Sequence, residues 1–309
     1  MSVSFSTSGF YGRSASAMNA LTARAEALQT QVSTGKKLQA PSDDAVAYQR
    51  LQGMRVAGAD DAAFGANVKI AQGVLASADS TLGSIGDQLQ KATELAVQAG
   101  NGTLSKDAKQ AIATQLKDVL ASIVGLANAK DARGAPLFGG SEAAVAGQAE
   151  TPAVTQAATG ALTFAAGQPS AIPIGDGQTV QPSVAARDVL KIKDDGTTTG
   201  RDIGEVITSM IATLEAGGTL SDDDNADLSA ISAQTTQAQA SVGARAVRVD
   251  LQAAYFTQVG TDREAARSDM EDVDVTTAIT ELQKTMTILS ATQASFSKLS
   301  QLSLFDYIR

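Results

Sequence analysis

Residues 75–96 read LASADSTLGSIGDQLQKATELA, and their apolar side chains recur at spacings that alternate between three and four residues. The apolar positions are Leu75, Ala78, Leu82, Ile85, Leu89, Ala92 and Ala96. Because an α-helix has about 3.6 residues per turn, this spacing places them along one side of a helix. We therefore predict a helix with a single apolar seam, which is typical of coiled coils and helix bundles.

The pattern continues, with gaps, over a much longer segment around this stretch. Ser42 is a suitable N-cap for the helix, and Asp43 and Asp44 would lie in its first turn, where carboxylates complement the helix dipole. We expect one helix from Ser42 to about Ala99, roughly 80 Å long at about 1.5 Å per residue. A helix of that length does not fit within a compact globule.

Further helical patterns lie on both sides of this segment. They cover residues 11–33, a segment capped by Ser105 that ends near residue 131, residues 201–218, residues 222–270, and a final helix that starts near residue 271. The seam of the first helix is Tyr11, Met18, Leu21, Ala25, Leu28 and Val32. That of the last is Val275, Ile279, Leu282, Met286, Leu289, then Gln293 and Phe296. Residues 1–10 are small and polar, and we expect them to be unstructured.

Residues 137–200 differ in composition from the helical regions. Proline, glycine, threonine and valine become frequent, and alternations such as ALTFAAG (161–167) and VLKIKDDG (189–196) indicate strands. The sequence IGDGQ (174–178) is typical of a hairpin turn. We predict a small inserted domain with β content between two helical regions.

The composition excludes several classes of function. The net charge is −9, which disfavours binding to nucleic acid or to anionic membranes. The chain has no cysteine and no histidine, which excludes disulfides, thiol nucleophiles, histidine-dependent triads and most zinc sites. Nowhere do eighteen apolar residues run together, and the N-terminus lacks the apolar core of a signal peptide, so we expect no membrane insertion.

The candidate ligand motifs are better explained as turns and helix ends. TGK at 34–36 lacks the upstream glycine and following hydroxyl residue of a phosphate loop. SDDDNAD at 221–227 lacks the alternating ligand spacing and central glycine of a calcium loop, and it fits the start of a helix. Nothing in the spacing of the acidic residues indicates a catalytic carboxylate pair. We therefore predict no cofactor, metal or catalytic residue.

The two ends of the chain are expected to associate with each other. Residues 1–55 hold six basic and three acidic residues, and residues 269–309 hold three basic and six acidic ones, so their net charges are +3 and −3. A two-helix coiled coil buries only one stripe of each helix, yet the last residues are also apolar. Such a surface requires neighbours, because exposed apolar patches of this size are usually interfaces.

Four separated stretches carry a resemblance to a known family. They are QVSTGKKLQAPSDDAVAYQRL (31–51), NGTLSKDAKQAIATQLKDVLASIVGLAN (101–128), SDMEDVDVTTAITELQ (268–283) and ASFSKLSQLSLFDYIR (294–309). Together they resemble the bacterial flagellin superfamily over roughly residues 1–140 and 200–309. The PSDD at 41–44 and the ending LSLFDYIR are most similar to its hook–filament junction branch. The opening MSVSFSTSGF differs from the MRIST usual in that branch, and a filament-forming flagellin is the alternative.

The resemblance implies a structural protein of the flagellum, not an enzyme, secreted by the flagellar type III system. It implies a mainly α fold, a rod-like bundle of long antiparallel helices with a terminal coiled coil and a small β-containing insert. Its implied domains are 1–42 with 271–309, disordered in the free monomer, 43–136 with 201–270, and the outward-facing insert 137–200. Implied partners are other copies of the chain, a hook-side adaptor protein, flagellin, and a cytoplasmic export chaperone on the C-terminal helix.

The expected interface residues follow from the seams together with this resemblance. We expect Met18, Leu21, Leu28 and Val32 to pair with Ile279, Leu282, Met286, Leu289 and Phe296. Leu302, Leu304, Phe305 and Ile308 would contact neighbouring subunits or the chaperone. A hypothesis of a different class is a surface adhesin or sugar-binding enzyme housed in residues 137–200.

Overall fold

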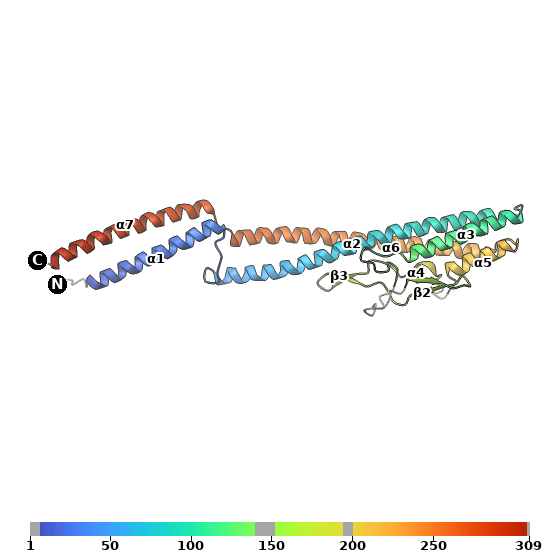
Figure 1. Ribbon diagram of the computed structural model, residues 1–309, viewed down its shortest axis with the longest axis horizontal. Helices are drawn as coiled ribbons and strands as arrows, with labels where there is room; N and C mark the ends of the chain where they lie inside the picture. The colour runs from blue at the N-terminus through green and yellow to red at the C-terminus, as the bar shows by residue number, and fades with distance from the viewer. Residues whose placement is uncertain (1–6, 140–151, 194–199, 308–309) are drawn as a thin grey trace. The chain divides into compact units, whose positions relative to one another are not determined.

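The computed structural model describes residues 7–139, 152–193 and 200–307, without the side chains of residues 7, 8, 10 and 299–307. The chain divides into two compact units, residues 1–59 with 259–309, and residues 60–258. Two long helices, α2 (Ala45–Ala99) and α6 (Asp222–Glu271), contribute residues to both units. The fold is mainly helical, as predicted from the seams (Figure 1).

The larger unit has one continuous hydrophobic core. The predicted seam of α2, from Leu75 to Ala96, lies in this core with every member at most 2% exposed. Helices α3 (Lys106–Ala127) and α5 (Ile203–Glu215) pack against each other and add Leu116, Ile123 and Ile207 to the same core. The α2 seam is therefore covered by several elements, which is why it is fully buried.

Capping residues set the starts of the shorter helices. The Ser105 hydroxyl accepts a hydrogen bond from the Ala108 N–H, as expected of an N-cap. Asp202 and Glu205 form a capping box at the start of α5, in which each side chain accepts from the other residue's backbone N–H. Burial raises the pKa of Asp202, although its hydrogen bonds from backbone N–H groups act in the opposite direction.

The region between the helices contains two antiparallel hairpins. β1 (Val154–Gln156) pairs with β2 (Leu162–Phe164), and β3 (Ile172–Gly175) pairs with β4 (Gln178–Val180). The turn of the second hairpin contains Gly177, at φ 63°, and confirms the prediction from IGDGQ. A short helix, α4 (Ala186–Leu190), follows.

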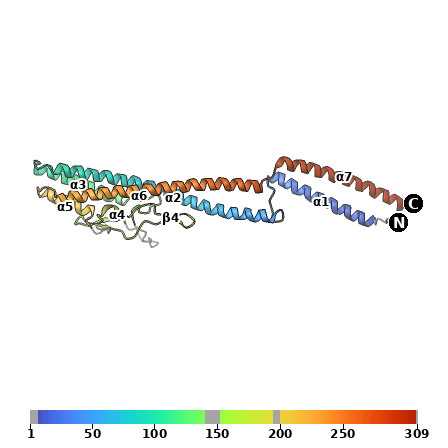
Figure 2. The same cartoon turned by 180° about the vertical axis from the view of Figure 1, so that it is seen from behind.

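The hairpins and α4 are anchored to the helices by side-chain hydrogen bonds. The Asn128 side chain donates to the Val154 carbonyl at 2.8 Å and accepts from the Val154 N–H at 2.9 Å. The Arg245 guanidinium donates to the carbonyl of Ser183 at 2.9 Å, and that of Arg248 to the carbonyl of Thr179 at 2.6 Å. Strands, α4 and helices therefore share one core, and Figure 2 shows the same region from behind.

The smaller unit contains α1 (Thr7–Thr34), α7 (Val275–Tyr307) and the adjoining ends of α2 and α6. Gly35, at φ 71°, ends α1 in the left-handed region that glycine tolerates. The Asp274 carboxylate accepts hydrogen bonds from the backbone N–H groups of Thr276 and Thr277 and so caps α7.

Three local predictions are wrong. Of the segment predicted to be unstructured, residues 7–10 belong to α1, and residues 1–6 lie outside the described residues. Asp44, not Ser42, caps α2, since its carboxylate accepts from the N–H of Val46 and Ala47. The described part of VLKIKDDG, residues 189–193, is not a strand: its first two residues end α4, and Lys191 forms an isolated bridge with Asp202. Residues 194–196 lie outside the described residues.

Gly204 tests how closely the strands approach α5. A Cβ at this position would lie 2.3 Å from the Gly160 carbonyl oxygen and 2.8 Å from Leu162 Cγ. We expect Gly204→Ala to lower the free energy of unfolding by about 1–3 kcal/mol, despite the better helix propensity of alanine. Gly86→Ala, in α2 with no atom within 4 Å, is the control and should gain about 0.5–1 kcal/mol in urea unfolding. Equal effects would contradict the close packing.

Candidate functional site: the paired terminal helices

The helices α1 and α7 lie side by side and run antiparallel. The rings of Tyr11 and Phe296 meet edge to face with their centroids 5.4 Å apart. Further along, the Arg24 guanidinium contacts the Glu281 carboxylate at 2.6 Å. These two pairs show the antiparallel register of the two helices.

The predicted seam of α1 faces α7 but is not fully covered. Met18, Leu21, Leu28 and Val32 are all partly buried, together with Tyr11 and Ala25 on the same stripe. Among the described side chains of α1, none reaches the burial of the α2 seam. A single neighbouring helix covers only one side of a side chain, so its apolar surface stays partly in water.

The seam of α7 differs from the predicted one. Ala278 and Thr285 are buried, at 5% and 6% exposure, and Leu282, Leu289 and Phe296 are partly buried. Ile279 and Met286, which we expected to pair with α1, are 39% and 56% exposed. The observed stripe is Ala278, Leu282, Thr285, Leu289, Thr292 and Phe296.

The predicted seam of α7 differs from the observed stripe at two places. At each, the prediction selected the larger apolar residue, Ile279 or Met286, whereas the smaller residue one position earlier is buried. Threonine can occupy such a stripe because its hydroxyl bonds within the helix, as Thr285 does to the Glu281 carbonyl at 2.8 Å. Reading the three-four spacing with threonine included would have found the stripe.

The remaining interface predictions fall at the end of α7. Leu302, Leu304 and Phe305 lie in α7, but the structure does not describe their side chains. Ile308 lies outside the described residues.

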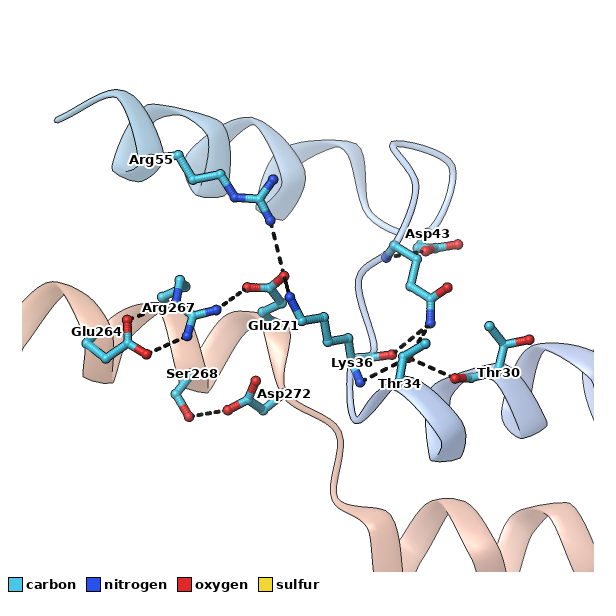
Figure 3. A network of polar contacts seen from close by, with 11 residues as sticks. Thr30, Thr34, Lys36, Asp43, Arg55, Glu264, Arg267, Ser268, Glu271 and Asp272 are labelled. Atoms are coloured by element: carbon cyan, nitrogen blue, oxygen red, sulfur yellow. Dashed lines mark hydrogen bonds and ion pairs between the residues drawn. The ribbon is translucent and has the colours of Figure 1, made fainter. Parts of the chain in front are cut away.

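An ionic cluster joins the ends of α1, α2 and α6, as Figure 3 shows. The Glu271 carboxylate, with a side chain only 2% exposed, accepts hydrogen bonds from Lys36 at 2.6 Å, Arg267 at 2.7 Å and Arg55 at 3.1 Å. The hydrogen bond from Lys36, together with that from Arg267, holds the pKa of Glu271 below its usual range, although burial acts the other way. The sequence patterns did not indicate this cluster, because Lys36 and Arg55 lie 235 and 216 residues from Glu271 in the chain.

The backbone is paired at the same place. The Lys37 N–H donates to the Glu271 carbonyl at 2.7 Å, and the Val273 N–H donates to the Gly35 carbonyl at 2.9 Å. The residues that leave α1 and those that enter α7 are therefore held to each other by main-chain hydrogen bonds.

The described residues offer little for chemistry. Among them, no group of three or more acidic side chains is arranged to hold a metal ion. None of the helices in the described ranges combines the length and the hydropathy needed to cross a membrane. What the arrangement provides is apolar surface on paired helices, which suits assembly.

Comparisons with known proteins identify the class of this helical protein. Residues 5–143 match the family model described as the bacterial flagellin N-terminal helical region. Residues 228–308 match the model described as the bacterial flagellin C-terminal helical region. The chain belongs to the bacterial flagellin superfamily.

Individual relatives are more specific. The chain is 25% identical to flagellar hook-associated protein 3 of Escherichia coli over 288 residues, covering 89% of this chain and 90% of that protein. It is 34% identical to flagellar hook-associated protein 3 of Salmonella typhimurium over 113 residues, covering 37% of this chain and 36% of that protein. A flagellar hook-associated protein of Vibrio parahaemolyticus shares the fold, with a TM-score of 0.62 and 22% identity over 74% of this chain and 100% of that one.

Substitutions in the two seams should differ in cost. Leu82→Ala, in the fully buried α2 seam, should cost about 2–5 kcal/mol. Leu28→Ala, in the partly buried α1 seam, should cost about 1 kcal/mol or less, because less apolar area leaves water there. Native-state hydrogen exchange measures the opening free energy of each helix separately. Similar costs at the two sites would contradict the incomplete cover of α1.

Proposed function

We propose that this chain is a structural subunit of the bacterial flagellum that joins the hook to the filament. The observation that carries the proposal is a pair of terminal helices whose apolar side chains a single chain leaves partly in water. Support for the particular role comes from the E. coli relative, a flagellar hook-associated protein aligned over nearly its whole length. The subunit is secreted and has no catalytic role.

The terminal helices are the proposed assembly surface. Ile279 and Met286 are exposed on α7, away from the stripe that faces α1, and we assign them to contacts with neighbouring subunits. Burying exposed apolar side chains between copies supplies the free energy that offsets the ordering of the helices. Met18, Leu21, Leu28, Val32, Leu282, Leu289 and Phe296 would hold the pair together within one subunit.

The proposed partners follow from the same role. They are further copies of the chain, a hook-side adaptor protein and flagellin, with an export chaperone on the C-terminal helix before secretion. Leu302, Leu304, Phe305 and Ile308 would contact a neighbouring subunit or this chaperone. The three-part division into 1–42 with 271–309, 43–136 with 201–270, and 137–200 stays a prediction, with the last part facing outward.

A deletion strain tests the junction role. Cells that lack the gene should be non-motile and should release unpolymerised flagellin into the medium. Normal filaments on the deletion strain would reject the proposal. Purified protein that grows into long filaments by itself would instead support the alternative, a filament-forming flagellin.

The exposed face of α7 can be tested separately in the complemented strain. The double variant Ile279→Ser, Met286→Ser should fold like the parent, because both side chains are exposed, but should restore motility to less than about a tenth of the parent's level. Thr287→Ser, an exposed change on the same helix, is the control and should restore motility fully. Full motility with a correctly secreted double variant would exclude this face from assembly.

A further inference from the structure

One buried carboxylate holds three separate segments of the smaller unit. Lys36 follows α1, Arg55 lies in the first turns of α2, and Arg267 lies in the last turns of α6, and all three donate to Glu271 (Figure 3). The side chains of these cations are 42%, 47% and 32% exposed, whereas that of Glu271 is 2% exposed. The cations keep access to water, and the carboxylate depends on them.

The three cations are divided unequally between the two carboxylate oxygens of Glu271. One Glu271 oxygen accepts from both Lys36 and Arg55, and the other accepts from Arg267. Removing one partner of a buried ion pair is strongly destabilising, because the other charge is left uncompensated. Here the loss of the Glu271 charge would leave Lys36 and Arg55 without the carboxylate that both bind, and Arg267 with Glu264 alone.

The main-chain pairing beside the cluster is short, and its nearest other support is the hydrogen bond from the Lys37 side chain to the Asp269 carbonyl and the buried Leu38. It consists of the hydrogen bonds from Lys37 to Glu271 and from Val273 to Gly35. Val273 is only partly buried, and Lys37 and Asp272 are exposed. Such a pairing is stable only if the neighbouring side chains hold the two segments in place.

We propose that Glu271 is an electrostatic latch that keeps residues 35–37 paired with residues 271–273, and that neutralising this carboxylate releases the pairing while the helices stay folded. The latch makes the connections of α1 to α2 and of α6 to α7 a joint with a closed and an open state. The inference concerns the fold of the subunit alone and does not rest on the proposed function.

The pH dependence follows from the charged groups around the cluster. Lys36, Arg55 and Arg267 face Glu271, while Glu264 binds Arg267, Asp272 accepts from Ser268, and Lys37 donates to the Asp269 carbonyl. Because the pKa of Glu271 is lowered in the folded chain, the latch is fully closed above the ordinary pKa of glutamate. It opens only when the pH falls through the lowered value.

The test compares Glu271→Gln with Glu264→Gln in the full chain. Glu264 also binds Arg267, but its side chain is 65% exposed, so its neutralisation should matter little. In Glu271→Gln we expect the amides of Lys37 and Val273 to exchange at least about tenfold faster, with the amides of Leu82 and Leu116 unchanged. In Glu264→Gln all four rates should stay within about twofold of the parent.

Salt distinguishes repulsion between cations from a purely structural loss. At about 1 M salt the Debye length is about 3 Å, so screening should restore part of the protection in Glu271→Gln. Unchanged exchange at Lys37 and Val273 in Glu271→Gln, equal loss in Glu264→Gln, or no recovery in salt would overturn the proposal. If Glu271→Gln does not fold, protection of the same two amides in the parent chain, followed from neutral to acid pH, gives the answer: constant protection overturns the latch.

Discussion

The organisation of this protein depends on one geometric constraint: a pair of helices can bury only one stripe of each partner. In residues 60–258 the constraint is met by adding α3, α5, two hairpins and α4 around α2 and α6, and the seam of α2 disappears from solvent. Among the described residues, the pair formed by α1 and α7 has no such additional layer within its unit, so its seam stays partly exposed. The seam of α2 is thus fully buried and that of α1 only partly buried because α2 has more neighbouring elements.

The same constraint explains which parts of the chain are fixed by polar contacts. The insert is tied to the helices by bonds from Asn128, Arg245 and Arg248 to backbone groups, which satisfy strands too short to be stable alone. At the ends of α1 and α6, outside the continuous core of the larger unit, the cluster around Glu271 adds polar contacts to the buried Leu38 and Leu51. Polar contacts therefore hold the chain where the hydrophobic core does not reach.

Much of the fold could be predicted from local pattern. The seams of α1 and α2, the cap at Ser105 and the hairpin at IGDGQ follow from spacing and turn chemistry, which act within a few residues. The end of α4 at Leu190 did not, because a short segment follows its tertiary neighbours. The extension of α1 to Thr7 did not either, since the small residues before Tyr11 carry no helical pattern. The face of α7 was only partly predicted, since Ala278 and Thr285 carry a weaker hydrophobic signal than Ile279 and Met286.

In the Glu271 cluster only the pair with Arg267, four residues earlier on α6, has a local signal in the sequence. Lys36 and Arg55 meet Glu271 only through the folded arrangement of the chain. Membership in the flagellin superfamily was indicated by four separated motifs, which together carry more information than any single seam.

The most direct test of the central claim is amide hydrogen exchange along the whole chain at low protein concentration, without any partner. The account predicts that the amides of α1 and α7 are weakly protected from exchange and that those of α2, α3 and α5 within residues 60–258 are strongly protected. On assembly, the amides of the terminal helices should become more protected. Terminal helices as strongly protected as the core in the isolated chain would contradict it.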